Sequence, residues 1–166
     1  MPDTSSAAPQ TMLVHGTTVA CGSAAILLRG KSGAGKSDLA LRFMADQGRW
    51  PLEADARHLV ADDQTQLTVR TGQIIAGSPA AIAGLLEVRG VGIVGVPAGA
   101  STILRLVVDL VPPEMIQRLP APDGAIELLG HKIAHRRLAP FEASAALKLA
   151  LLLVKLDTED PPTESS

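Results

Sequence analysis

Short runs of aliphatic and β-branched residues, separated by glycines and polar turns, dominate the hydrophobic pattern of this chain. Runs of this length that end at glycine, proline or acidic residues are typical of strands. Two pairs of runs are joined by tight turns at Gly72 and Gly130, which predicts hairpins. The predicted strands cover residues 12–20, 24–28, 57–61, 66–70, 73–76, 85–88, 102–111, 126–129 and 132–136.

Two longer segments have the composition of helices. In residues 36–47, Leu39 and Phe43 recur at helical spacing and define an apolar face, and Gly48 is suited to cap the C-terminal end. Residues 141–156 carry leucines on almost every face of a helix. We therefore expect the second helix to pack into the body of the protein or against another subunit.

The order of these elements predicts an α/β fold with a mixed sheet and flanking helices. Hairpins and isolated strands outnumber helices, so a regular alternation of strand and helix is not present. We expect one domain over residues 12–157, with a flexible glycine-rich stretch at 90–99. Residues 1–11 and 158–166 have few large apolar side chains and are predicted to be flexible tails.

Composition and charge narrow the class of protein. A length of 166 residues suits one ordinary domain. Aromatic residues make up only 2% and the net charge is −2, which argues against a nucleic-acid partner because base stacking and a basic surface are both missing. Cys21 is the only cysteine, and neither a signal-peptide pattern nor a membrane-spanning run occurs. These features favour a cytoplasmic protein with no membrane partner.

The strand predicted at 24–28 leads directly into a phosphate-binding loop motif, Gly-x-x-x-x-Gly-Lys-Ser. A glycine-rich turn between strand and helix directs backbone N–H groups and the positive end of the helix dipole at a bound phosphate chain. Lys36 would reach the β- and γ-phosphates, and Ser37 would ligate Mg²⁺. The alternative is a glycine turn with a surface lysine. The residues of the loop are Gly30, Lys31, Ser32, Gly33, Ala34, Gly35, Lys36 and Ser37.

An acidic pair, Asp62 and Asp63, follows the strand predicted at 57–61. Carboxylates at the end of such a strand support the magnesium ion in phosphate-loop enzymes. Neighbouring side chains on an extended strand point to opposite sides, so the two aspartates cannot hold the same position. One would serve the metal and the other an acceptor hydroxyl. A solvated acidic turn is the alternative.

Three further residues are candidates for chemistry. Glu87 and Arg89 are two positions apart in a glycine-rich apolar segment, where a carboxylate could face the metal and a guanidinium could bind phosphate oxygens; an ordinary surface ion pair is equally consistent with this spacing. His15 lies on the strand before the loop and could face the nucleotide; the alternative is an ordinary packing or surface residue. His131 and His135 are about 13 Å apart on a strand, too far for one metal ion.

Four of these segments, in this order, resemble the catalytic domain of the HPr kinase/phosphorylase family. Members of that family phosphorylate a serine of HPr, a bacterial phosphotransferase carrier. The resemblance implies a fold like that of the phosphoenolpyruvate-carboxykinase group of phosphate-loop proteins. The matching segments are Val14-His15-Gly16, residues 30–38, residues 59–63 and the signature at residues 86–93.

The resemblance also implies a role for each candidate residue. Lys36 would bind the phosphates of ATP, and Asp63 would take the proton of the acceptor serine with help from His15. In the reverse direction a protonated Asp63 would act as the acid, with inorganic phosphate as the attacking group. The magnesium ligands implied are Ser37, Asp62 and Glu87.

The implied function is an ATP-dependent serine kinase of HPr or an HPr-like carrier, and we expect a homo-oligomer. This chain resembles short α-proteobacterial forms, with only a short segment before the catalytic part. Residues 135–140 replace the Pro-Gly-Arg-Asn type segment of the family, which leaves reverse phosphorolysis open. Two other hypotheses remain, namely phosphoryl transfer to a different acceptor and a nucleotide-binding regulatory module.

Overall fold

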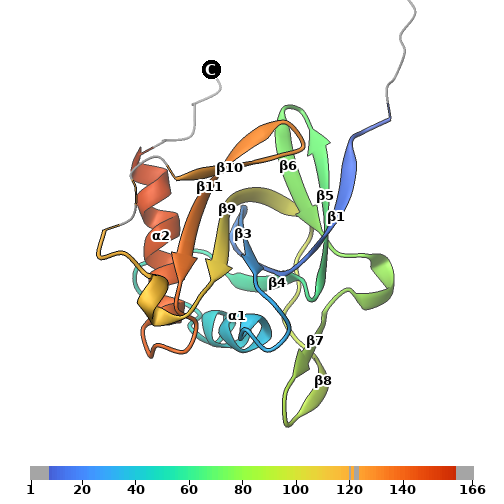
Figure 1. The fold of residues 1–166 in the computed structure, drawn as a ribbon. Coiled ribbons are helices and arrows are strands. Elements are labelled where there is room, and N and C mark those ends of the chain that lie inside the picture. The colour runs from blue at the N-terminus through green and yellow to red at the C-terminus, as the bar shows by residue number, and fades with distance from the viewer. Residues whose placement is uncertain (1–7, 120, 122–123, 160–166) are drawn as a thin grey trace, which may run out of the picture.

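The computed structural model describes residues 8–119, 121 and 124–159. A nine-stranded mixed sheet forms its centre, and a two-stranded hairpin projects from it (Figure 1). The strands of the large sheet are β1 (Thr11–His15), β2 (Thr17–Cys21), β3 (Ala24–Arg29), β4 (Arg57–Ala61), β5 (Gln64–Arg70), β6 (Gln73–Gly77), β9 (Thr102–Leu110), β10 (Ala125–Leu128) and β11 (His131–Leu138). The hairpin consists of β7 (Leu85–Val88) and β8 (Gly92–Gly95).

Strand β9 is the common neighbour within the large sheet. It runs parallel to β3 along one edge and, on the other, pairs antiparallel with β6 at its start and parallel with β11 at its end. From β3 the sheet continues through β2 to β4, and from β6 through β5 to β1. The predicted mixed sheet is therefore confirmed.

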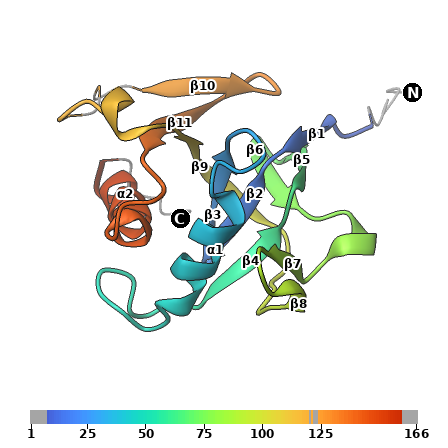
Figure 2. The same cartoon turned by 60° about the horizontal axis from the view of Figure 1, so that its bottom comes forward.

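Two helices, α1 (Lys36–Ala45) and α2 (Ala145–Glu159), pack against each other and cover one face of the sheet (Figure 2). Short 3-10 helices occupy Ala80–Ile82 and Pro113–Met115. Strand β3 is buried on both faces, because Ile26 and Leu28 pack with the helices while Ala25 and Leu27 enter a second cluster with residues of β5, β6 and β11. The strand before the loop is thus held from both sides.

The strand predicted over residues 12–20 is in fact two strands, β1 and β2, separated at Gly16. A Cβ at position 16 would lie 2.7 Å from the carbonyl oxygen of Leu28, so only glycine allows this close approach. The Gly16 N–H donates instead to the carbonyl oxygen of Asp63, at 2.8 Å. Strand β1 then pairs with β5, while β2 pairs with β3 and β4.

Other segments also differ from the predictions. The C-terminal helix begins at Ala145, and residues 139–144 form a loop along α1. The stretch at 90–99 contains strand β8, which pairs with β7 after a turn in which Gly90 and Gly92 have positive φ. Helix α2 runs through Glu159, and β1 begins at Thr11, so each end of the ordered fold includes residues predicted as tail. The remaining predicted tail residues, apart from 8–10, lie outside the described residues.

An ion cluster joins the three parallel strands β3, β9 and β11. The Arg29 guanidinium donates to both carboxylate oxygens of Asp109, at 2.7 and 3.0 Å, and the His135 Nε2 lies 2.8 Å from one of them. Burial alone would raise the pKa of Asp109, but the hydrogen bonds and charges of Arg29 and His135 outweigh it and lower that pKa below its ordinary value of 3.8. The cluster lies immediately before the phosphate loop.

We predict that Asp109→Asn lowers the free energy of unfolding by about 2 kcal/mol at pH 7, because it removes a charge-assisted pair and leaves Arg29 without its anion. The folded-state pKa is depressed, so this stabilisation is complete above the ordinary value of 3.8 and disappears as the pH falls through the folded value. Urea unfolding of both proteins at a series of pH values would measure the difference.

The matched control is Asp157→Asn, since Asp157 is 57% exposed and lies 3.6 Å from Arg105 in a surface pair. This variant should differ little from the parent at any pH. A stability difference for Asp109→Asn that persists unchanged below pH 3 would contradict the assignment of the effect to the Asp109 charge.

Candidate functional site

The loop between β3 and α1 presents backbone N–H groups at the N-terminal end of a ten-residue helix. Gly33 and Gly35 have φ of 82° and 96°, values that favour glycine, and Gly35 caps α1 without any side-chain hydrogen bond. The first N–H groups of a helix have no partner inside the helix. In this protein they are available to an anion.

Lys36 is almost buried beside this loop, with 8% of its surface exposed. Its Nζ donates to the carbonyl oxygens of Gly30 and Lys31, at 2.7 and 3.0 Å. An ammonium group carries three protons, so these two bonds leave one for a ligand oxygen. The backbone of the loop thus holds the lysine charge at the pocket wall.

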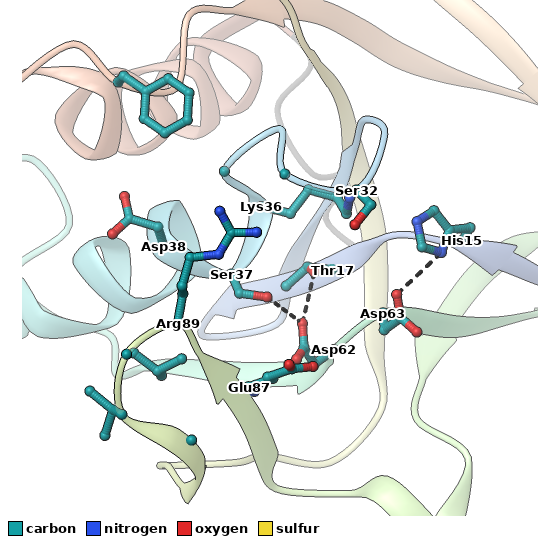
Figure 3. A pocket seen from close by; sticks show the side chains of 17 residues that line it. His15, Thr17, Ser32, Lys36, Ser37, Asp38, Asp62, Asp63, Glu87 and Arg89 are labelled. Carbon is teal, nitrogen blue, oxygen red and sulfur yellow. Dashed lines mark hydrogen bonds and ion pairs between the residues drawn. The ribbon is translucent and has the colours of Figure 1, made fainter.

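Asp62 connects four separate segments of the site (Figure 3). Its Oδ1 accepts hydrogen bonds from the hydroxyls of Thr17 and Ser37, at 2.9 and 2.8 Å, and its Oδ2 accepts the backbone N–H of Glu87, at 3.1 Å. Only 9% of this residue is exposed. The carboxylate therefore fixes β2, the start of α1 and β7 relative to the end of β4.

Asp63 occupies a different place in the same pocket, as the sequence predicts. Strand β4 ends at Ala61, and Asp63 has a φ of 63°, so the turn into β5 directs its carboxylate toward the junction of β1 and β2. The His15 Nδ1 lies 3.3 Å from the Asp63 Oδ1. Both side chains are more than half exposed, and a substrate can therefore reach them.

Glu87 and Arg89 lie on the hairpin side of the pocket. Glu87 is on β7 with its carboxylate beside that of Asp62, and Arg89 follows the end of β7 with its guanidinium toward the phosphate loop (Figure 3). The turn after β7 uses Gly90, whose φ is 82°, and places Val91 N–H on the Val88 carbonyl. No ion pair joins Glu87 to Arg89 in the described part of the chain, in contrast to the surface-pair alternative.

These groups surround a cavity of about 850 Å³, a size suited to a nucleotide. Every candidate catalytic and metal-binding residue lines it, together with Ser32, Gly33 and Gly35 of the loop. Gly30 and Lys31 contribute through their carbonyls to Lys36, whereas Ala34 packs beneath the loop against Gly30. His131 and His135 do not meet: His131 contacts Leu129, and His135 belongs to the Asp109 cluster.

Two lining residues, Thr17 and Phe141, lie outside every segment that the sequence analysis assigned to the site. Thr17 is fully buried and donates to Asp62, yet a threonine in a strand has no signal that separates this role from ordinary β propensity. Phe141 is predicted to lie in the C-terminal helix, but it is in the loop before that helix, which begins at Ala145.

The described helices include none that is both long and apolar enough to cross a membrane.

Comparison with known proteins places the chain in a family. The HPr Serine kinase C-terminal domain family matches residues 6–146. Among curated relatives, the HPr kinase/phosphorylase of Clostridium tetani is 40% identical over 99 residues, which is 58% of this chain and 29% of that protein. The HPr kinase/phosphorylase of Clostridium acetobutylicum is 38% identical over 99 residues, with the same coverage. The chain thus spans under a third of the length of these relatives.

A solved structure supports the same fold. The HPr(Ser) kinase/phosphatase from Coxiella burnetii superposes with a TM-score of 0.71 at 22% sequence identity, over 89% of this chain and 93% of that one. The α/β fold with a mixed sheet and flanking helices is therefore shared with it. From the extent of the family match, the chain belongs to the HPr Serine kinase C-terminal domain family.

Proposed function

We propose that this domain transfers the γ-phosphoryl group of ATP to a serine of HPr or an HPr-like carrier protein. The observation that carries the proposal is the pairing of an exposed carboxylate, Asp63, with His15 in the same pocket as the phosphate loop and Lys36. A module that only binds nucleotide has no need of an acceptor base. The relatives that carry the name HPr kinase/phosphorylase indicate which acceptor to test first.

The side-chain oxygens that line the pocket suit Mg²⁺, which prefers oxygen ligands such as carboxylates and hydroxyls. Ser37, Asp62 and Glu87 would hold the ion, directly or through water, since their oxygens gather at one side of the loop (Figure 3). When bound, the ion would neutralise charge on the β- and γ-phosphates. The hydrogen bond from Thr17 would keep the Asp62 carboxylate in place for this role.

The residues of the chain divide the remaining work between donor and acceptor. Lys36 and the loop N–H groups would bind and orient the phosphates, and Arg89 would place positive charge over the transferred group. Asp63 would accept the proton of the serine hydroxyl, with His15 orienting its carboxylate. This division explains why Asp62 is buried and accepts three hydrogen bonds while Asp63 is open to the solvent.

We predict that Asp63→Asn lowers the rate of phosphoryl transfer to HPr by about 10²- to 10⁴-fold, because the amide cannot accept the serine proton. ATP affinity should change little, since the proposed role of Asp63 is to accept the serine proton and not to bind the phosphates. The measurement uses radiolabelled ATP, Mg²⁺ and purified HPr, with label on the carrier serine as the readout.

Asp157→Asn, the same substitution on the exposed surface of α2, is the control and should transfer at the parental rate. Nucleotide binding by the parent without label on HPr would refute the proposed acceptor and favour the regulatory-module hypothesis. Label on another protein or small molecule would favour a different acceptor.

A second prediction concerns Lys36→Met, which keeps the aliphatic stem and removes the charge. ATP affinity should fall by roughly 10- to 100-fold, because a charge-assisted bond to the phosphates is lost. The melting temperature should stay within a few degrees of the parent, since the Nζ contacts only two loop carbonyls. Calorimetric titration and thermal melts would measure both.

Lys132→Met, on the exposed surface of the β10–β11 hairpin, controls for the loss of a lysine charge and should bind ATP normally. Unchanged ATP affinity in Lys36→Met would remove the assignment of the phosphate loop.

A further inference from the structure

The loop at residues 139–144 carries an exposed aromatic ring beside the phosphate loop. Ala139 and Pro140 are buried, but Phe141 is 72% exposed. Exposure of a phenylalanine side chain forgoes the stabilisation that burial would give. A single exposed ring is common in proteins, so its significance depends on how its position is fixed and on what it faces.

Polar contacts from α1 hold the backbone on both sides of this ring. The Arg42 guanidinium donates to the carbonyl oxygen of Pro140 and to that of Glu142, the latter at 3.4 Å. The Arg42 Nε also donates to Asp38, at 3.0 Å, one residue after Ser37. Phe141 is therefore anchored to the helix that begins at the phosphate loop, although its ring takes no part in the core.

The ring lies over the last glycine of the loop. A Cβ built at Gly35 would approach two carbons of the Phe141 ring to 3.0 and 3.1 Å, and Phe141 lines the same cavity as Lys36 and Asp63. Phe141 is the one aromatic residue, histidine aside, among the described residues that line this cavity. Phe43 is buried in the core, and Trp50 is not among the lining residues. The glycine thus leaves space for the edge of the ring.

The ring and the acceptor pair lie at opposite ends of the loop. Asp38, which shares the Arg42 guanidinium with the Phe141 segment, lies on the far side of Ser37 from His15 and Asp63 (Figure 3). If the γ-phosphate is directed toward Asp63, the remainder of a nucleotide extends toward Asp38 and Phe141. This step rests on the proposed function, which sets the direction of the phosphate chain.

We infer that Phe141 is the platform on which the base of the bound nucleotide stacks. A flat aromatic base gains energy from an aromatic face, and an exposed, positioned phenyl ring supplies that face. The ring has no hydrogen-bonding group, so it cannot read the edge of the base and stabilises adenine and guanine to a similar extent. Phe141 therefore contributes affinity for purine nucleotides without selecting between ATP and GTP.

The test compares Phe141→Ala with the parent by calorimetric titration with MgATP, MgGTP and magnesium inorganic triphosphate, which has no base. The affinity for ATP and for GTP should fall about tenfold in each case, while that for triphosphate stays unchanged. Phe141→Trp should restore ATP binding. In a Trp50→Phe background, its indole emission should change with ATP and not with triphosphate.

Three outcomes would overturn the inference. An equal loss of triphosphate affinity in Phe141→Ala would show that the ring supports the loop and does not contact the base. Unchanged nucleotide affinity with a raised KM for HPr would place the ring on the acceptor side. Failure of the parent to bind ATP would overturn the proposed function and this inference with it, a result distinct from the other two.

Discussion

The carboxylate of Asp62 is the constraint on which the geometry of the site depends. A nearly buried anion is costly unless hydrogen bonds compensate for its lost hydration. Here three donors do so, and they come from β2, the start of α1 and β7, which are far apart in the sequence. The phosphate loop, the acidic turn and the projecting hairpin are therefore held together by one charged group, and the same group is a proposed ligand of the magnesium ion. Structural and chemical demands thus converge on a single side chain.

Local signals made part of this arrangement predictable. The loop motif, the helix after it and the strand before Asp62 depend on glycine spacing and on short apolar runs, which act over a few residues. The break at Gly16 could not be predicted in this way, because its cause is the close approach of the Leu28 carbonyl from a neighbouring strand. The same holds for the positive φ of Asp63, which depends on the turn into β5 and on the bond between its carbonyl and Gly16. The sequence predicted that Asp62 and Asp63 hold different positions, but not which neighbours fix each of them.

The start of the C-terminal helix illustrates a second limit. Leucine-rich composition over 141–156 predicts a helix, and most of that segment is helical. The first four residues are not, because Arg42, about a hundred positions earlier, binds the carbonyls of Pro140 and Glu142. A tertiary hydrogen bond overrides local propensity there, and the consequence is an aromatic ring in the pocket instead of the core. The role of Thr17 could not be predicted for a related reason, since its hydrogen-bond partner, Asp62, is 45 positions away and is brought to it only by the fold.

The placement of β9 has a consequence for the order in which this site can form. The loop follows β3, and β3 finds its parallel neighbour only when the chain has been extended to β9, with Arg29 and Asp109 separated by 80 positions. Pairings over such distances close large loops and are slow to form. Strand β11 must then add to the free edge of β9 before His135 can complete the ion cluster. The phosphate loop lies early in the sequence, yet the strands that support it are complete only when the chain extends through β11.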